Sequence, residues 1–536
     1  MTTTDLIIIG AGPGGYRAAE YAAKQGLKVA IFEGSEVGGT CLNIGCIPTK
    51  TYVHSATFEE ARERMAQVIP QLRAGVEGIL SHPNITLVPE KASFATTPLL
   101  QEGLGEVPII IATGSETKWL PIPGKDDPRV VDSTGLLNLD TLPKRLCIIG
   151  AGVIGMEFAS VFNRFGSEVT VVEYLKECLP ALDSDIAKRL RKYMEKCGIT
   201  FHMQCAVKEI ADGEVRFENK KGQMEKVEAD VILMATGRKP RTEGLNLESL
   251  GLTLAPNGAI PVDDNYRVPT PLLQEGMGEV ISNIYAIGDV NGRQMLAHAA
   301  EMQAVHAVNH ILGKTDNIRF DIMPAAIFTE PEAACVGPTE DQLKEQGIEY
   351  VCKKAFWRAN GKALAMNETE GMLKLFVSPP KFFAEQSGKA ERVGVPEGRG
   401  GLNSALRPGL ILGCHAYGAH AADIVQEVSV LMCKHTTLHE LADMAKFSHE
   451  MLDYWLYGNA KGLARLVADG FENNNELQKL MLEDRNRQWF DKLHSANLQN
   501  MSVLSVVGAG HLVGPDSILN LFQKNGYAVT AGNIPK

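Results

Sequence analysis

The chain has 536 residues, of which 45% are hydrophobic and 22% charged, a composition that excludes a largely disordered protein. The formal net charge of −11, from 53 basic and 64 acidic residues, argues against nucleic acid or an anionic membrane as the main partner. No run of about 18 uninterrupted apolar residues occurs, so no membrane span is expected. The N-terminal segment has no basic region and no small-residue cleavage site, which predicts a cytoplasmic location.

The chain begins with the pattern of a nucleotide-binding βαβ unit. Residues 6–33 predict a buried strand, a glycine turn, a helix and a second strand. In the turn, Gly10 allows the tight bend, Gly12 lets a pyrophosphate approach the backbone, and Gly15 lets the helix pack on the strand. Glu33 follows 23 residues after Gly10, where a carboxylate accepts hydrogen bonds from ribose hydroxyls. The segment therefore predicts a dinucleotide site.

Two of the ten cysteines stand close together just after this unit. Cys41 and Cys46 are five residues apart, and residues at that spacing do not share a face of a regular helix. A disulfide between them requires an irregular turn, for which Gly45 and Pro48 supply backbone freedom and restriction. In a cytosolic protein such a pair is more often catalytic than structural. A metal site is the alternative, but two sulfurs with no nearby histidine or further cysteine lack ligands, so no metal is expected.

A second nucleotide-binding unit repeats the pattern of the first. Gly150, Gly152 and Gly155 follow an apolar strand, and Glu173 again comes 23 residues after the first glycine. An acid at this place favours a free ribose 2′-hydroxyl and hence NAD over NADP. Glu157, early in the helix, could face the second cofactor or support packing. Two such units in one chain predict two cofactors.

Several motifs along residues 1–444 resemble the flavin-dependent pyridine nucleotide–disulfide oxidoreductase family. The segment C-L-N-I-G-C-I-P-T-K that starts at Cys41 is most similar to the dihydrolipoamide dehydrogenase branch of that family. The other motifs that carry the resemblance occupy residues 109–115, 234–240, 284–289, 295–298, 323–332 and 411–423.

The resemblance implies an α/β fold with two Rossmann-like nucleotide-binding domains, an α+β interface domain and an atypical C-terminal extension. The expected domains are the first part of the FAD-binding domain (1–143), the NAD-binding domain (144–265), the return of the FAD-binding domain (266–320), the interface domain (321–444, with an inserted loop at 378–408) and the C-terminal segment (445–536).

The resemblance also implies FAD and NAD as cofactors. The residues expected to bind FAD are Gly10, Gly12, Gly15, Glu33, Lys50, Thr113, Gly114, Asp289, Met295, Leu296, Ala297 and His298. Those expected to bind NAD are Gly150, Gly152, Gly155, Glu157, Glu173 and Gly237.

The implied reaction is the oxidation of dihydrolipoamide by a Cys41–Cys46 disulfide, with electrons passing through FAD to NAD⁺. Cys41 would exchange with the substrate sulfur, and Cys46 would be the thiolate nearer the flavin. The implied partners are dihydrolipoamide, or the lipoyl domain of a 2-oxoacid dehydrogenase or glycine cleavage complex, and a second copy of the chain in a homodimer.

The chain departs from the family near its C-terminus. The family uses a histidine followed by proline as a base, and Ser448 occupies that place by spacing. His449 is one residue late, which turns a helical side chain by about 100°. It is the candidate base.

From about Lys446 the chain resembles the C-terminal part of the TraB/GumN-type family. Residues 451–459, 483–489 and 503–514 carry this resemblance. That family is suspected of metal-dependent peptidase chemistry, for which Arg485, Asn486 and His511 would be the polar candidates.

Two further functions stay open beside the lipoamide enzyme. One is a flavoprotein with NADH diaphorase activity and impaired lipoamide turnover. The other is a TraB-like hydrolase or scaffold with a vestigial flavin part.

The segments 97–107 and 270–280 are near-copies of each other that differ only at Leu104 and Met277. Both are expected to be inserted between strands.

Overall fold

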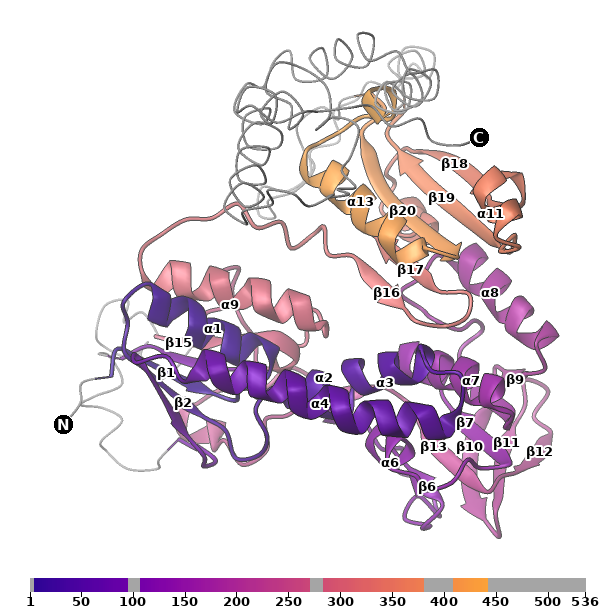
Figure 1. The fold of residues 1–536 in the computed structure, drawn as a ribbon, viewed down its shortest axis with the longest axis horizontal. Helices are drawn as coiled ribbons and strands as arrows, with labels where there is room; N and C mark the ends of the chain where they lie inside the picture. The colour runs from indigo at the N-terminus through magenta and orange to yellow at the C-terminus, as the bar shows by residue number, and fades with distance from the viewer. Residues whose placement is uncertain (1–3, 95–106, 270–282, 380–407, 442–536) are drawn as a thin grey trace, which may run out of the picture. The chain divides into compact units, whose positions relative to one another are not determined.

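The structure is a computed structural model that describes residues 4–94, 107–269, 283–379 and 408–441. The chain divides into two compact units, one of Met1–Val393 with Ile411–His435 and one of Gly394–Leu410 with Thr436–Lys536. The first unit contains all the elements described below (Figure 1). In the second unit, the Leu438 N–H donates to the Gly409 carbonyl at 2.7 Å.

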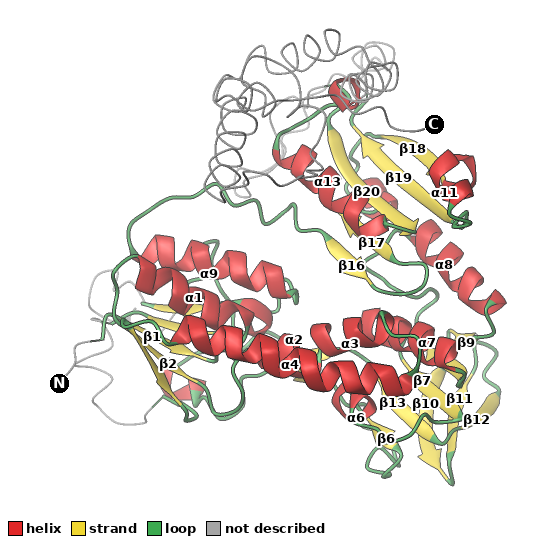
Figure 2. Ribbon diagram, viewed as in Figure 1, coloured by secondary structure: helices red, strands yellow, loops and turns green. Residues whose placement is uncertain are grey.

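A five-stranded parallel sheet forms the first nucleotide-binding fold. Its strands are apolar because helices cover the sheet, and α1 and α9 lie side by side over it (Figure 2). In spatial order the strands are β15 (Ile284–Ala286), β4 (Ile109–Ile111), β1 (Leu6–Ile9), β2 (Val29–Phe32) and β3 (Ile85–Val88). The helices of this part are α1 (Pro13–Lys24), α2 (Gly39–Ile44), α3 (Cys46–Val53), α4 (Phe58–Leu80), α9 (Ala297–Ile311) and the 3-10 turns Leu247–Leu250 and Gly288–Asn291.

A second five-stranded parallel sheet repeats this arrangement. The strand order is β6 (Val130–Val131), β13 (Val231–Met234), β7 (Arg145–Ile149), β8 (Glu168–Glu173) and β9 (Thr200–Met203). Its helices are α6 (Ser133–Leu137), α7 (Val153–Phe165) and α8 (Ser184–Lys196). An antiparallel sheet of β10 (Ala206–Ala211), β11 (Glu214–Glu218) and β12 (Met224–Glu228) lies between β9 and β13 in the chain. The predicted α/β class with two nucleotide-binding folds is confirmed.

A short antiparallel ribbon joins the two folds. Strand β5 (Ser115–Thr117) follows β4, and β14 (Arg238–Pro240) follows β13. The two strands pair so that Arg238 lies opposite Thr117 and Pro240 opposite Ser115. The carboxyl ends of β4 and β13, one from each sheet, therefore meet.

The third part of the first unit is an antiparallel sheet with helices. Its strand order is β16 (Ala325–Ile327), β17 (Ala333–Val336), β20 (Ile411–Gly418), β19 (Gly371–Val377) and β18 (Val351–Phe356). Its helical segments are α10 (Glu340–Glu345), α11 (Gly361–Ala365), α13 (Ala421–Cys433) and the 3-10 turn Trp357–Ala359. All residues of β20 are buried, since it lies in the middle of the sheet against α13.

Both nucleotide-binding helices begin within the glycine turns. Helix α1 begins at Pro13 and α7 at Val153. Gly12 and Gly152 are extended N-caps with φ of −72° and −74°, so the glycine turn already contains the first helical turn. Proline fits the first position of a helix because its missing N–H would have no partner there.

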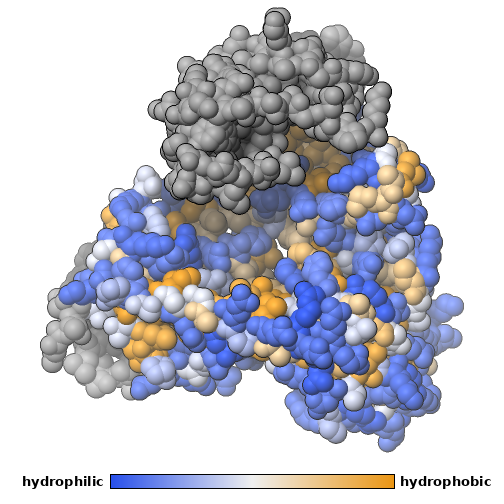
Figure 3. All heavy atoms as spheres, viewed as in Figure 1, coloured by the Kyte–Doolittle hydropathy of each residue, from blue (hydrophilic) through white to orange (hydrophobic). Residues whose placement is uncertain are grey.

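The face drawn in Figure 3 is hydrophilic over most of the described surface, with apolar residues in small groups. Among the described residues, none of the helices has the length and apolar character needed to cross a bilayer.

Candidate active site

The two glycine turns and the two cysteines open into one cavity of about 2770 Å³. Of the predicted cofactor-binding residues, Gly15 and Gly155 do not line it, because they face the packing between helix and strand. The predicted residues that line it are Gly10, Gly12, Glu33, Cys41, Cys46, Lys50, Thr113, Gly114, Gly150, Gly152, Glu157, Glu173, Gly237, Asp289, Met295, Leu296, Ala297 and His298.

The first glycine turn has no room for side chains at two positions. A Cβ at Gly10, which has φ +102°, would lie 2.5 Å from the Ala112 carbonyl oxygen. A Cβ at Gly15 would lie 1.8 Å from the Gly10 carbonyl oxygen. Gly12 is different, since the nearest atom to its Cβ would be the Gly39 Cα at 3.9 Å. Space therefore remains at Gly12, beside the N-terminus of α1, where a pyrophosphate fits.

The second turn has the same geometry. A Cβ at Gly150 would lie 2.4 Å from the Ala235 carbonyl oxygen, and one at Gly155 2.0 Å from the Gly150 carbonyl oxygen. A Cβ at Gly152 would have no neighbour within 4 Å. Both cradles fit a dinucleotide pyrophosphate, one for each predicted cofactor.

Glu33 and Glu173 are held in the same way in their two folds. Glu33 Oε2 accepts from the Ala11 N–H at 2.8 Å, and Glu173 Oε2 accepts from the Ala151 N–H at 2.5 Å. The other oxygen of each carboxylate accepts a backbone N–H two residues further on, at 2.9 and 2.6 Å. Each carboxylate oxygen has a second lone pair, which leaves it able to accept from a ribose hydroxyl.

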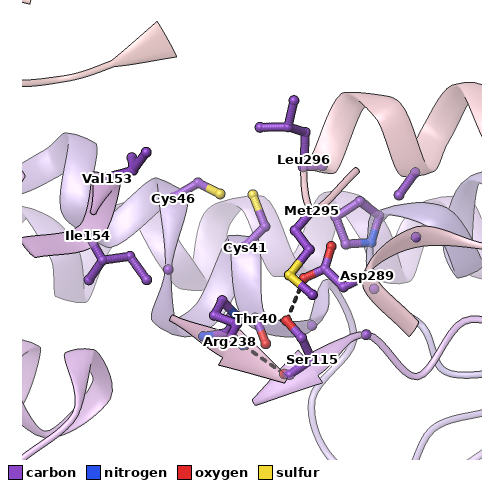
Figure 4. Close-up of a pocket in the computed structure, with 18 of the residues that line it drawn as sticks. Thr40, Cys41, Cys46, Ser115, Val153, Ile154, Arg238, Asp289, Met295 and Leu296 are labelled. Carbon is purple, nitrogen blue, oxygen red and sulfur yellow. Dashed lines mark hydrogen bonds between the residues drawn. The ribbon is translucent and has the colours of Figure 1, made fainter. Parts of the chain in front are cut away.

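Cys41 and Cys46 lie on two different helices whose sulfur atoms face each other (Figure 4). The break between α2 and α3 falls at Gly45, with φ −141° and ψ −110°, which is the irregular turn that the spacing required. Both residues are free thiols. A hydrogen bond from Cys41 to Cys46, the nearby Lys50 and the N-terminus of α3 lower the pKa of Cys46. The same hydrogen bond and burial raise the pKa of Cys41.

Lys50 and Glu157 flank the redox pair. The Lys50 Nζ lies 4.2 Å from the centre of the Phe328 ring, and the Phe328 N–H donates to Glu157 Oε1 at 2.9 Å. Burial raises the pKa of Glu157 to about 7, against the opposing effects of the Phe328 N–H and of Lys50. Glu157 thus lines the cavity and also binds the backbone of a neighbouring segment.

A chain of three polar side chains lies beside the redox pair and was not predicted as a whole. Arg238 Nε donates to Ser115 Oγ at 2.7 Å, and Ser115 Oγ donates to Asp289 Oδ2 at 2.5 Å (Figure 4). Burial raises the pKa of Asp289 and lowers that of Arg238. Ser115 and Arg238 directly follow the turn residues Gly114 and Gly237, but only the pairing of β5 with β14 brings them together.

The remaining predicted flavin residues lie at the start of α9 and after β4. His298 Nε2 lies 2.8 Å from the Pro324 carbonyl oxygen, and the Thr113 hydroxyl donates to the Arg241 carbonyl at 2.7 Å. The candidate base His449 and the candidates Arg485, Asn486 and His511 lie outside the described residues. Within the described ranges, no group of three or more His, Cys, Asp or Glu side chains could hold a metal ion.

Family models match three parts of the chain. Residues 4–304 match the pyridine nucleotide-disulphide oxidoreductase model, and residues 323–381 match the dimerisation domain of the same family. Residues 422–531 match the TraB/PrgY/gumN family. Both resemblances predicted from the sequence motifs are therefore confirmed.

Curated relatives and solved structures agree with the first match. The chain is 38% identical over 411 residues to dihydrolipoyl dehydrogenase 3 of Pseudomonas putida, an alignment that covers 70% of this chain and 86% of the relative. It is 37% identical over 407 residues to leghemoglobin reductase of Glycine max, covering 69% and 76%. The HOCl-induced flavoprotein disulfide reductase RclA of Escherichia coli is similar in structure, with a TM-score of 0.66, 30% identity and coverage of 81% and 94%.

The two open glycine cradles, the two fixed carboxylates and the facing cysteines suit a flavin and a pyridine nucleotide. Pyridine nucleotide–disulfide oxidoreductases of the dihydrolipoyl dehydrogenase type use FAD and NAD(H). The chain belongs to the pyridine nucleotide–disulfide oxidoreductase family.

Proposed function

We propose that the protein oxidises dihydrolipoamide to lipoamide and reduces NAD⁺. The observation that carries the proposal is the pair of facing thiols, with the pKa of Cys46 lowered, in the cavity that both glycine turns share. The relatives named dihydrolipoyl dehydrogenase support the choice of substrate. FAD, when bound, accepts two electrons from the dithiol and delivers them to NAD⁺.

Each turn has its own ligand in this proposal. Gly12 with Glu33 would hold the pyrophosphate and ribose of FAD, and Gly152 with Glu173 those of NAD. The Ser115–Asp289 hydrogen bond fixes a carboxylate at the flavin side of the cavity.

The protein's own chemistry is thiol–disulfide exchange. One thiolate of dihydrolipoamide attacks the Cys41 sulfur of the oxidised pair, so that a mixed disulfide forms and Cys46 leaves as a thiolate. The second substrate thiolate attacks the substrate sulfur of the mixed disulfide, which closes lipoamide and releases Cys41 as a thiolate that takes up one of the two substrate protons. The other proton goes to solvent. Cys46 is suited to leave because its pKa is lowered.

NADH formation from dihydrolipoamide and NAD⁺ by the FAD-loaded protein tests this proposal. We expect Cys41→Ser and Cys46→Ser to abolish NADH formation. The exposed Cys197 serves as the control, and Cys197→Ser should leave the rate of NADH formation unchanged. A wild-type protein that forms no NADH contradicts the proposal.

A second candidate is a flavoprotein that passes electrons from NADH to another acceptor. The relative named leghemoglobin reductase and the neighbour RclA favour it, because they show that similar chains carry other names. Under this candidate, NADH would reduce artificial acceptors while dihydrolipoamide fails to produce NADH.

A homodimer and a lipoyl-domain partner complete the proposal. The match of residues 323–381 to the dimerisation domain supports the homodimer. Sedimentation should then give a mass of about twice 58.2 kDa. The cytoplasmic location stays a prediction.

A further inference from the structure

Helix α7 belongs to the second nucleotide-binding fold, yet one of its faces holds segments from elsewhere in the chain. Glu157, Ser160 and Arg164 are spaced three and four residues apart, so their side chains share a face of the helix. Ser160 Oγ accepts from the Glu330 N–H at 2.9 Å, in the segment after β16 that also contains Phe328. Arg164 is the residue of this face that reaches the redox helix.

Arg164 contacts the C-terminal end of α3. Its Nη2 atom lies 3.0 Å from the Tyr52 carbonyl oxygen, 2.7 Å from that of Val53 and 3.1 Å from that of Ser55. Carbonyl groups in the last turn of a helix lack partners within the helix, so a cation that donates to them stabilises the helix end. The Nη1 atom of Arg164 forms an ion pair with Oε2 of Glu330 at 3.0 Å.

The contact lies at the edge of an aromatic cluster, and the Arg164 side chain is 33% exposed. Tyr52 is fully buried, with its ring centre 6.4 Å from that of Phe162 and 6.1 Å from that of Phe165. The Arg164 guanidinium lies over the Phe165 ring at 5.5 Å. The helix end that Arg164 binds is therefore packed against aromatic residues of α7.

We propose that Arg164 is a positioning residue for the redox pair. By joining the end of α3 to α7 and to Glu330, it fixes the orientation of the helix whose first residue is Cys46. The inference rests on the redox role proposed for Cys41 and Cys46.

The orientation of α3 matters because the groups that act on the Cys46 thiolate come from different elements. Cys41 lies on α2, Lys50 on α3, Glu157 on α7 and Arg238 on β14. Lys50 moves with α3, whereas the other three do not. If the end of α3 is released, Cys46 changes its distance to Cys41, whose hydrogen bond stabilises the thiolate.

The test is the rate of alkylation of Cys46 by iodoacetamide across pH. The FAD-loaded protein is first reduced with dithiothreitol and freed of it, and the modified site is identified by peptide mass spectrometry. We expect Arg164→Met to slow alkylation of Cys46 at pH 7 about fivefold, which corresponds to a rise of about one unit in its pKa from about 7. Lipoamide turnover is not needed for this readout, so failure of the proposed function and failure of this inference can be distinguished.

Arg62 offers a matched control. Its side chain is 39% exposed against 33% for Arg164, it forms an ion pair with Asp140 at 2.9 Å, and it lies over the Phe58 ring at 6.0 Å. Its hydrogen bonds and ion pair are made with Asp140 and its ring contact with Phe58, all outside α3, and only its charge acts on Tyr52. Arg62→Met removes the same charge and should leave the alkylation profile of Cys46 unchanged.

A further variant separates position from charge. Arg164→Lys keeps the charge but has a compact ammonium in place of the planar fork, so it should restore only part of the wild-type rate. Melting temperatures of the variants are measured alongside. The inference is overturned if Arg164→Met behaves like Arg62→Met, or if Arg164→Lys restores the full rate.

Discussion

The Nζ atom of Lys374 lies 2.7 Å from Oδ1 of Asp183, and the two side chains are 1% and 0% exposed. Lys374 is on β19, while Asp183 is the N-cap of α8 in the second nucleotide-binding fold. A second acid, Glu340, lies 2.5 Å from the same Nζ atom. Two parts of the first unit are therefore joined through a buried charge cluster, in which removal of one charge leaves the others unpaired.

We expect Lys374→Met to lower the free energy of unfolding by about 3–5 kcal/mol, because it leaves Asp183 buried without its counter-ion. Urea denaturation followed by tryptophan fluorescence measures the change. Lys354→Met is the control, since the exposed Lys354–Asp185 pair should contribute less than about 1 kcal/mol. An equal loss of unfolding free energy in the two variants would show that the buried pair contributes no more than the exposed one.

His415 should make stability depend on pH. Its Nδ1 accepts the Asp183 N–H at 3.0 Å, and burial lowers its pKa to about 4. An unfolded histidine titrates near 6.5, so as pH falls the unfolded chain takes up the proton first. The contribution of the neutral imidazole is complete above about pH 6.5 and is lost between 6.5 and 4, by up to roughly 3 kcal/mol.

The measurement is the free energy of unfolding of wild type and His415→Gln between pH 7.5 and 4.5. The variant should be less stable at pH 7.5 but show a flatter decline across this range. Glu340 contributes at lower pH, because its pKa is lowered to about 2 by Lys374. The expectation is wrong if both proteins decline with the same slope.

Substituting alanine for two glycines of the second turn should affect different properties, nucleotide binding at Gly152 and stability at Gly155. Gly152→Ala adds a methyl group with no neighbour within 4 Å, so the melting temperature should not change while the KM for NADH rises about tenfold. Gly155→Ala places a Cβ 2.0 Å from the Gly150 carbonyl oxygen and should destabilise the fold by about 3 kcal/mol or more. A Gly152→Ala protein with unchanged KM would argue against nucleotide binding at this turn.

Glu157→Gln should lower the pKa of Cys46, because the charge of Glu157 raises it. Since Glu157 itself has a pKa of about 7, the difference from wild type should be small below pH 7 and larger above it. Alkylation of Cys46 across pH measures the effect. Glu168→Gln, at the exposed start of β8, should leave the profile unchanged, and an unshifted profile in Glu157→Gln would contradict the expectation.

The local sequence pattern was sufficient to predict the two glycine turns. The spacing of Gly10 and Gly150 from their acids predicted the units because strand, turn and helix are contiguous in the chain. The break at Gly45 followed from the geometry of two cysteines five residues apart. Such features depend on a few neighbouring residues, so the sequence contains them in full.

Contacts between distant segments could not be predicted in this way. The Arg238–Ser115–Asp289 chain joins three segments, and its middle residue is more than 100 positions from each of the others. Nothing in the pattern around Arg164 indicated that it would donate to carbonyl groups of Tyr52 and Val53. These contacts depend on how whole elements pack, which local periodicity does not encode.

The strands of the first sheet are not contiguous in the chain, and this affects the order in which the two sheets can form during translation. Strand β15 pairs with β4 but is translated about 170 residues later. At roughly 5–20 residues per second, the edge of β4 waits about 10–35 s for its partner. The second sheet lies entirely within that interval, so it can be completed first. The nascent chain therefore finishes its later nucleotide site before its earlier one.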